Sequence, residues 1–209
     1  MSETSSGQQA AAVAVFDPFA GADPAVSALR DALRAEGVDA EITSDPASAV
    51  AADGLVVAAS GDAAEALRVL RNTQVDRVVG QRLAGSRPVL VVGAAMDALF
   101  ERAADGAAGF GEWPGGVVKL DAPVERAAVA AADGSQMLDG AQEFVFNAAT
   151  GARDFELKED EFIAYPKLSW AGEVLAAVEN GPLWATRFHP ETSGEAGAGV
   201  LRNWIAQLG

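Results

Sequence analysis

The stretch "PVLVVGAAMDALFER", Pro88–Arg102, decides the fold. Its apolar run Pro88–Val92 predicts a buried strand, and Met96–Arg102 predicts a helix. A strand that enters a helix through a sharp turn is the place where many hydrolases and transferases present a nucleophile. The turn here is Gly93–Ala95, and none of these residues carries a group that can attack a substrate. The sequence thus predicts the architecture of an enzyme with an empty nucleophile position.

Strand and helix patterns alternate before this stretch. Apolar runs predict three further strands, at Ala11–Phe16, Ala40–Thr43 and Gly54–Ala59. Helical periodicity follows each of them, with an aspartate just before the first helical residue, and another helix is predicted at Gln74–Leu83. This rhythm is typical of a parallel sheet with helices on both faces, so the predicted fold class is α/β.

The pattern changes after about residue 105. Short strands are predicted in the C-terminal half, with a hairpin turn at Asn180-Gly181 and a closing amphipathic helix at Ser193–Leu208. The predicted strands are Val117–Leu120, Phe144–Phe146, Phe162–Tyr165, Val174–Val178 and Leu183–Phe188. The alanine-rich stretch 125–134 supports no assignment. We expect residues 11–209 to form a single domain and residues 1–10 to form a flexible N-terminal tail.

Composition excludes several classes of function. The chain has 209 residues, enough for one α/β domain, and a formal net charge of −15. Nucleic-acid binding needs a basic surface, and an anionic membrane repels an acidic protein, so we expect neither partner. No apolar run is long enough to span a bilayer, and residues 1–10 lack the pattern of a signal peptide. We therefore expect a cytoplasmic protein.

The chain contains no cysteine and one histidine, His189. This composition excludes disulfides, thiolate metal sites, cysteine nucleophiles and zinc sites built from His and Cys. No compact cluster of carboxylates suggests a Mg²⁺ site, so no metal and no cofactor are expected. The glycine-rich segment Gly106–Gly116 lacks the order of a phosphate-binding loop. The acidic segment Lys158–Glu161 is typical of a solvated turn.

The C-terminal stretch "AAVENGPLWATRFHPETSGEAGAGVLRNW", Ala176–Trp204, carries the most specific signal. It resembles the class I glutamine amidotransferases, and within them the glutaminase subunit of imidazole glycerol phosphate synthase, from histidine biosynthesis. Further segments resemble that subunit in the same order, namely Ala52–Val57, Arg82–Leu90, Leu99–Arg102 and Gly111–Val124. The resemblance covers nearly the whole chain. It implies a three-layer, flavodoxin-like domain with a mostly parallel central sheet and additional short strands in the C-terminal half.

The resemblance also implies the positions of a Cys-His-Glu triad. His189 and Glu191 stand where the family keeps its histidine and glutamate, and Gly93 stands at the position of the cysteine. In that family the cysteine forms a thioester with glutamine, and the histidine moves the proton. Without the attacking sulfur, His189 and Glu191 would be vestigial.

The segments that correspond to the family's substrate-site and partner-binding motifs differ from those motifs in this sequence. The family's P-G-V-G loop, which supplies an oxyanion hole, becomes Ala58–Gly61, and the glutamine of its G-I-C-x-G-M-Q motif becomes Asp97. Ser60, Gly61 and Asp97 are therefore the candidate substrate-binding residues. The D-Y-G-S-G-N segment becomes Asp17–Ala22, and the H-M-G-W-N segment is absent. The resemblance implies a protein partner, the cyclase of the same synthase, but these changes argue against retained binding.

The main hypothesis is a catalytically degenerate relative that does not hydrolyse glutamine and has a binding or regulatory role. One alternative is an active amidotransferase component that supplies ammonia to the cyclase through an unorthodox nucleophile, Ser60 or Ser86. Another alternative is a module that binds a small metabolite in the space vacated around Gly93–Ala95.

Overall fold

The computed structural model describes residues 10–155 and 165–208. Within them, a seven-stranded sheet has the strand order β2-β1-β3-β4-β10-β9-β8. Its strands are β1 (Ala12–Phe16), β2 (Asp39–Thr43), β3 (Gly54–Ala59), β4 (Val89–Gly93), β8 (Lys167–Ala171), β9 (Val174–Asn180) and β10 (Leu183–Thr186). Five strands of this sheet are parallel, namely β1, β2, β3, β4 and β10. At one edge, β9 runs antiparallel to β10, and β8 runs antiparallel to β9. The predicted mostly parallel α/β fold is confirmed.

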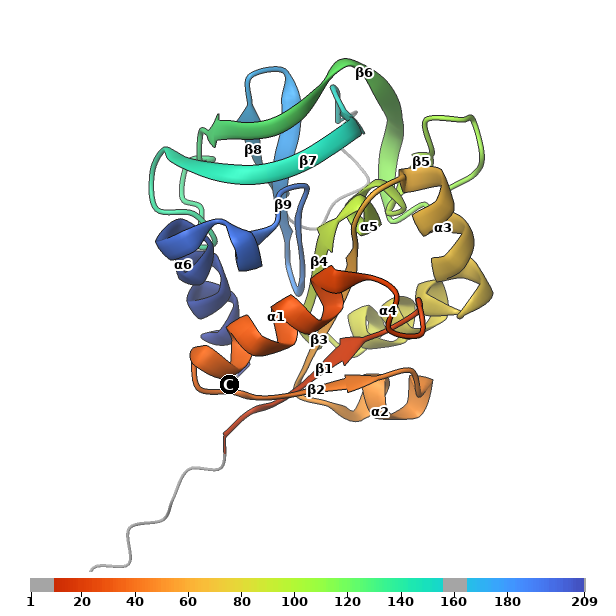
Figure 1. Cartoon of the computed structure of the whole chain (residues 1–209), viewed down its shortest axis with the longest axis vertical. Helices are drawn as coiled ribbons and strands as arrows, with labels where there is room; N and C mark the ends of the chain where they lie inside the picture. The colour runs from red at the N-terminus through yellow and green to blue at the C-terminus, as the bar shows by residue number, and fades with distance from the viewer. Residues whose placement is uncertain (1–9, 156–164, 209) are drawn as a thin grey trace, which may run out of the picture.

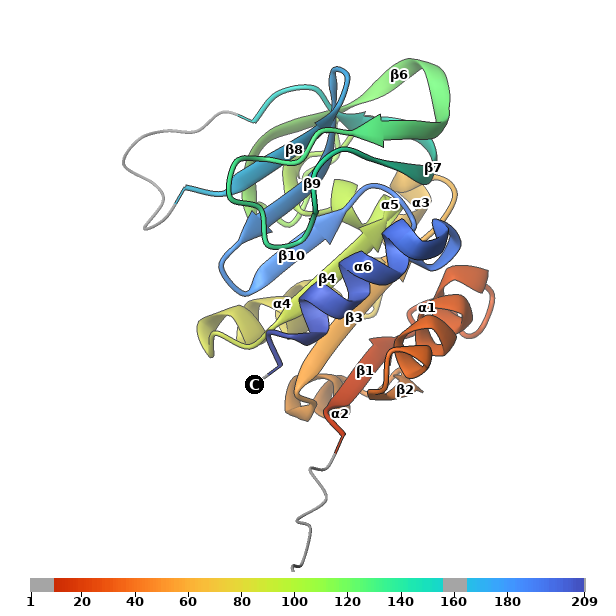
Figure 2. The ribbon, with the colours of Figure 1, turned by 90° about the vertical axis from the view of Figure 1, so that its left-hand side faces the viewer.

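Helices cover both faces of this sheet (Figure 2). On one face lie α1 (Pro24–Ala35) and α6 (Gly194–Ile205), and on the other lie α2 (Pro46–Ala51), α3 (Ala63–Asn72), α4 (Val75–Ala84) and α5 (Ala94–Asp97). The central strands β3 and β4 are buried along their whole length, as expected for strands that are covered on both sides. The side chains of Asp23, Asp45 and Asp62 cap α1, α2 and α3, which explains why each helix begins where it does.

A second sheet forms a curved ribbon next to the main one (Figure 1). It contains β5 (Phe100–Arg102), β6 (Trp113–Val129) and β7 (Gln142–Ala152). Aromatic packing joins this ribbon to the chain after β10. Phe144 stacks on Phe188 with ring centroids 4.0 Å apart, and Phe146 meets the same ring edge-on at 5.7 Å. The segment that contains His189 is thereby fixed against β7.

Several predicted elements are confirmed and one is wrong. The hairpin at Asn180-Gly181 joins β9 to β10, and the closing helix is α6. The helix predicted at Met96–Arg102 is wrong, because α5 ends at Asp97 and β5 begins at Phe100. Phe100 is fully buried and pairs with Trp113 of β6, so tertiary contacts override the helical pattern.

Other predictions are changed in extent or lie outside the described residues. The unassigned stretch 125–134 contains the end of β6, which continues to Val129. The tail predicted at residues 1–10 lies almost entirely outside the described residues, as do the strand predicted at Phe162–Tyr165 and the turn at Lys158–Glu161. Among the described residues, we find no helix with both the length and the apolar character needed to cross a membrane.

The guanidinium of Arg82, in α4, holds the N-terminal ends of the central strands together. Its side chain is completely buried and donates five hydrogen bonds of 2.8–3.1 Å to backbone carbonyls. The acceptors are Ala49, Val50, Ala52, Asp53 and Pro88. Burial lowers the pKa of Arg82 to about 10, so the group is still cationic at neutral pH. It joins the end of α2 and the start of β3 to the residue before β4.

We expect Arg82→Met to lower the free energy of unfolding by about 2–4 kcal/mol, because it removes the donor from the carbonyls of Ala49 and Asp53, whereas the other three carbonyls keep a donor from Arg87 or Leu55. Urea denaturation followed by far-UV circular dichroism measures this loss. The matched control is Arg77→Met in the same helix, where the side chain is exposed and donates a hydrogen bond to Gln74 at 3.4 Å. That change should stay within about 0.5 kcal/mol. Equal losses for the two variants would contradict the role of Arg82.

Candidate functional site

Gly93 lies at the turn where β4 enters α5, as the strand–turn–helix pattern predicts. Its backbone has φ 69° and ψ −136°. Glycine adopts such a conformation freely, whereas other residues adopt it only under strain of about 1–3 kcal/mol. Register pairs Gly93 with Ala59 at the end of β3, so the turn lies at the carboxyl edge of the parallel strands.

His189 and Glu191 form a buried hydrogen-bonded dyad beside this turn. The Nδ1 atom of His189 lies 2.8 Å from Oε1 of Glu191, and their side chains are 6% and 2% exposed. A carboxylate can only accept, so Nδ1 carries the proton of this bond. The backbone N–H of His189 donates to the carbonyl of Val145 in β7 at 2.7 Å, which fixes the position of the residue. The structure thus brings the predicted His and Glu together in the geometry of a base and its orienting carboxylate.

The ring of His189 fills the space that a side chain at position 93 would need. An ideal Cβ built on Gly93 would lie 2.6 Å from Cε1 and 2.9 Å from Nε2 of His189. It would also lie 2.4 Å from the backbone oxygen of Ala59. Real Cβ atoms essentially never have neighbours closer than 3.0 Å. Position 93 therefore carries no reactive atom, and a larger side chain there requires its neighbours to shift.

Ser60 and Gly61 follow β3 at the same edge of the sheet. The backbone N–H and the hydroxyl of Ser60 both donate to the carboxylate of Asp23, each at 2.7 Å. Asp23 is 8% exposed and also accepts from the N–H of Ala25 at 3.0 Å. The donors of Ser60 are thus committed to the cap of α1. Gly61 has φ 76° and an open side that no atom approaches within 4 Å.

Asp97 lies away from the dyad's pocket, in a buried ionic cluster. Its carboxylate is 3.1 Å from Nε of Arg187 and accepts from the Thr150 hydroxyl at 2.5 Å. The side chains of Asp97 and Arg187 are 3% and 1% exposed. Burial raises the pKa of the Asp97 carboxyl, and the charge of Arg187 opposes that shift. The cluster ties α5 to β7 and to the residue after β10.

A cavity of about 180 Å³ opens beside the dyad. It is lined by Pro24, Ala25, Ala28, Ser60, Asn147, His189, Glu191 and Thr192. Asn147 has φ 49°, a left-handed conformation that costs energy outside glycine and often marks a functional position. The cavity therefore gathers three of the predicted site residues, whereas Gly93 lies behind the His189 ring and Asp97 is buried elsewhere.

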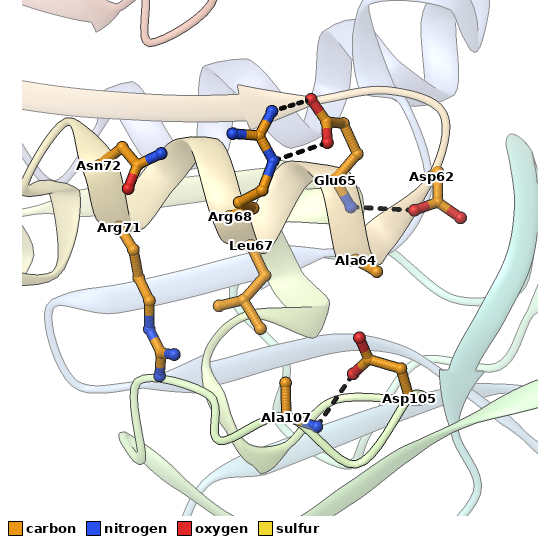
Figure 3. Close-up of a pocket in the computed structure, with 9 residues that line it drawn as sticks. All are labelled: Asp62, Ala64, Glu65, Leu67, Arg68, Arg71, Asn72, Asp105 and Ala107. Carbon is orange, nitrogen blue, oxygen red and sulfur yellow. Dashed lines mark hydrogen bonds and ion pairs between the residues drawn. The ribbon is translucent and has the colours of Figure 1, made fainter.

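A larger groove of about 500 Å³ lies between α3 and the loop at 105–107 (Figure 3). Its basic side chains already have partners: Arg68 pairs with Glu65, and Arg71 donates to the carbonyls of Ala108 and Gly109. None of the predicted site residues lines this groove. The smaller cavity is therefore the better candidate for a functional site.

Sequence reasoning does not find every member of the site. The sequence indicates Asp23 only as the residue before a helix, and neither Asn147 nor Thr150 is among the candidate site residues that it predicts. Their roles depend on contacts between residues far apart in the chain, so a local pattern cannot reveal them. For Asp23, the proximity of the loops after β1 and β3 in a parallel sheet is the one available signal. Among residues 10–155 and 165–208, no group of three or more His, Asp or Glu side chains could hold a metal ion.

Comparison with known proteins identifies relatives along most of the chain. The chain is 45% identical over 195 residues to the imidazole glycerol phosphate synthase subunit HisH of Nocardia farcinica, covering 87% of this chain and 92% of that protein. It is 44% identical over 197 residues to the HisH subunit of Thermobifida fusca, covering 86% and 93%. No family model matches the chain.

Solved structures share the fold at low identity. A glutamine amidotransferase from Thermotoga maritima superposes with a TM-score of 0.59 at 13% identity, covering 96% of this chain and 83% of that one. The glutaminase domain of Trypanosoma brucei CTPS, solved with bound acivicin, gives a TM-score of 0.64 at 12% identity, covering 95% and 93%.

The similarity covers 87% of the chain, and it agrees with the fold, in which a strand–turn–helix lies at Gly93 and His189 contacts Glu191. A chain without cysteine cannot form the thioester by which these enzymes act. This protein therefore belongs to the HisH family of class I glutamine amidotransferases, and it is a member whose chain contains no cysteine.

Proposed function

We propose that this protein is a non-catalytic member of the HisH family, which does not hydrolyse glutamine and acts by binding. The observation that carries the proposal is the packing of the His189 ring against Gly93. A missing sulfur alone would leave an otherwise intact site. Here the His189 ring and the carbonyl of Ala59 occupy the space that the Cβ of a cysteine at position 93 would need.

The dyad supports binding rather than covalent chemistry. A histidine base accelerates acyl transfer by taking a proton from a nucleophile within hydrogen-bond reach. The Nε2 edge of His189 faces the Cα of a glycine, which offers no proton. The hydrogen bond to Glu191 then orients the His189 ring, which packs against Gly93 and forms part of the cavity wall.

An unorthodox serine mechanism is the competing proposal, because Ser60 lines the same cavity as His189. Its hydroxyl proton, however, is donated to the Asp23 carboxylate at 2.7 Å. Its backbone N–H also donates to Asp23, so it is not free to stabilise an oxyanion. Ser86 precedes β4, whereas Gly93 ends it, so the length of the strand, about 13 Å, separates this serine from the site. Neither serine is placed to attack a substrate.

The cyclase partnership of the family is also proposed to be lost. The segment Asp17–Ala22 folds on itself, since the Asp17 carboxylate accepts from the N–H groups of Phe19 and Gly21 at 2.9 and 2.7 Å. The segment after Val124 continues as β6 in the ribbon with β7. Both segments differ in sequence from the family's motifs, so a surface that fits the cyclase is not expected here.

In an assay of ammonia release from glutamine, we expect the wild-type protein to give the reagent blank. Gly93→Cys should give the blank as well, because the new side chain has no room beside His189. A cysteine-containing HisH protein serves as the positive control. Hydrolysis by the wild type that disappears in Ser60→Ala and in His189→Ala would overturn the proposal in favour of the serine mechanism.

We expect Gly93→Ala to lower the free energy of unfolding by about 3–5 kcal/mol, through backbone strain and overpacking together. Gly61→Ala is the matched control, since that glycine also has positive φ but nothing lies within 4 Å of its open side. The control should lose about 1–2 kcal/mol. Adding His189→Ala to Gly93→Ala should recover part of the loss, by about 0.5–3 kcal/mol of coupling. Urea denaturation of the wild type, the single variants and the double variant measures this coupling. If the losses of Gly93→Ala and His189→Ala simply add in the double variant, the packing argument is contradicted.

Size-exclusion chromatography with the cyclase of the same organism tests the partnership. We expect the two proteins to elute separately at micromolar concentration. Co-elution in a stable complex would contradict the proposed loss and would make this protein a scaffold or an inhibitor of the synthase.

A further inference from the structure

We infer that the cavity beside His189 binds a small organic cation of the primary-ammonium class. The inference rests on the proposed function, because it supplies the ligand for a site that has lost its nucleophile. The cavity lies at the carboxyl edge of the parallel strands, where the chain leaves β1 for β2 on one side and β3 lies on the other. Open α/β sheets bind ligands at such a switch point.

The first observation is an unsatisfied buried carboxylate in the cavity wall. Oε1 of Glu191 is held by His189, but Oε2 is buried and has no hydrogen-bond partner among the described residues. The side chain is 2% exposed. Buried carboxylate oxygens in folded proteins are nearly always paired, so an orphan beside a cavity indicates a missing donor.

The second observation is a second buried carboxylate, Asp23, which lies next to the lining residues Pro24 and Ser60. Asp23 lies directly behind Ser60, and its described partners are uncharged N–H and O–H groups. Among the described residues that line the cavity, none is Lys or Arg. The nearby Arg187 is committed to Asp97. No fixed basic side chain of the described cavity wall therefore neutralises the two carboxylates.

The competing effect is the N-terminus of α1, which borders the cavity at Pro24 and Ala25. A helix N-terminus carries about half a positive charge and attracts anions. The two carboxylates of Glu191 and Asp23 together outweigh this partial charge. The field in the cavity is therefore negative, in a protein whose net charge is −15. An anionic ligand would be repelled and a cation attracted.

The size and the lining of the cavity define the ligand further. A volume of about 180 Å³ admits a small molecule, but not a nucleotide. Pro24, Ala25 and Ala28 form an apolar wall that suits a short alkyl chain. Asn147 and Thr192 can add hydrogen bonds to a polar end. A short alkylammonium ion matches both walls.

Because His189 is the only histidine, its ring signals in ¹H–¹³C NMR spectra report on this cavity alone. The probes are propylammonium chloride, 1-propanol and sodium propionate, which share one alkyl chain and differ in charge. At pH 7.5 and constant ionic strength, we expect a saturable shift with propylammonium only, with half-saturation at about 1–20 mM for so small a ligand. Equal shifts with propanol, with propionate or with added NaCl, or no saturable shift with propylammonium, would overturn the inference.

A matched pair of variants tests the role of the carboxylate. Glu191→Gln should weaken propylammonium binding at least tenfold, whereas Glu195→Gln, at an exposed glutamate of α6, should leave it unchanged. Unchanged affinity in Glu191→Gln would overturn the inference. If that variant does not fold, the comparison of the three probes on the wild type still decides. Glutamine hydrolysis measured on the same sample tests the proposed function separately. Detectable turnover would refute the proposed function, whether or not propylammonium binds.

Discussion

The fold depends on a buried cation that satisfies backbone carbonyls from three segments. Arg82 gathers the end of α2, the start of β3 and the residue before β4 at one end of the sheet. That contact fixes the relative position of β3 and β4, whose register then brings Ala59 and Gly93 side by side at the opposite end. The crowding around Gly93 is thus set by an interaction about one strand length away. Because strand pairing is rigid, the Ala59 carbonyl, 2.4 Å from the place of a Cβ on residue 93, cannot simply move aside.

The parts of the fold that the sequence predicts are those with strong local patterns. The apolar run of β3 predicts that strand with its observed bounds, and the helices whose first turns are capped by Asp23, Asp45 and Asp62 begin where those residues indicate. The short strand β5 has no such local signal, because Phe100 is placed by its contact with Trp113 and not by its neighbours in sequence. Tertiary burial decides between helix and strand for such short apolar segments.

The candidate site is predictable in outline and not in detail. Motif positions place Gly93, His189 and Glu191 together, and in the structure the His189 ring lies beside Gly93 and contacts Glu191. Their roles as triad positions stay a prediction. No pattern can indicate that the ring of His189 fills the nucleophile's space, since this depends on how a loop fixed by Val145 and Phe188 meets the turn. Asp97, predicted at the substrate, is found with Arg187 in a buried ion pair. A buried carboxylate and a buried guanidinium are best explained as an ion pair, and neither position by itself indicates the other in the sequence.

The conformation of Gly93 has a consequence for how this lineage can change. A catalytic residue lost through one substitution can return through one substitution only while its site stays open. On the proposed function, a cysteine introduced at position 93 would meet the ring of His189 and the backbone of Ala59 before it could offer any activity. Regaining the chemistry would require at least two coordinated changes, with a destabilised intermediate between them. On the proposed function, single substitutions can therefore reshape the cavity for a new ligand more easily than they can restore a cysteine nucleophile at position 93.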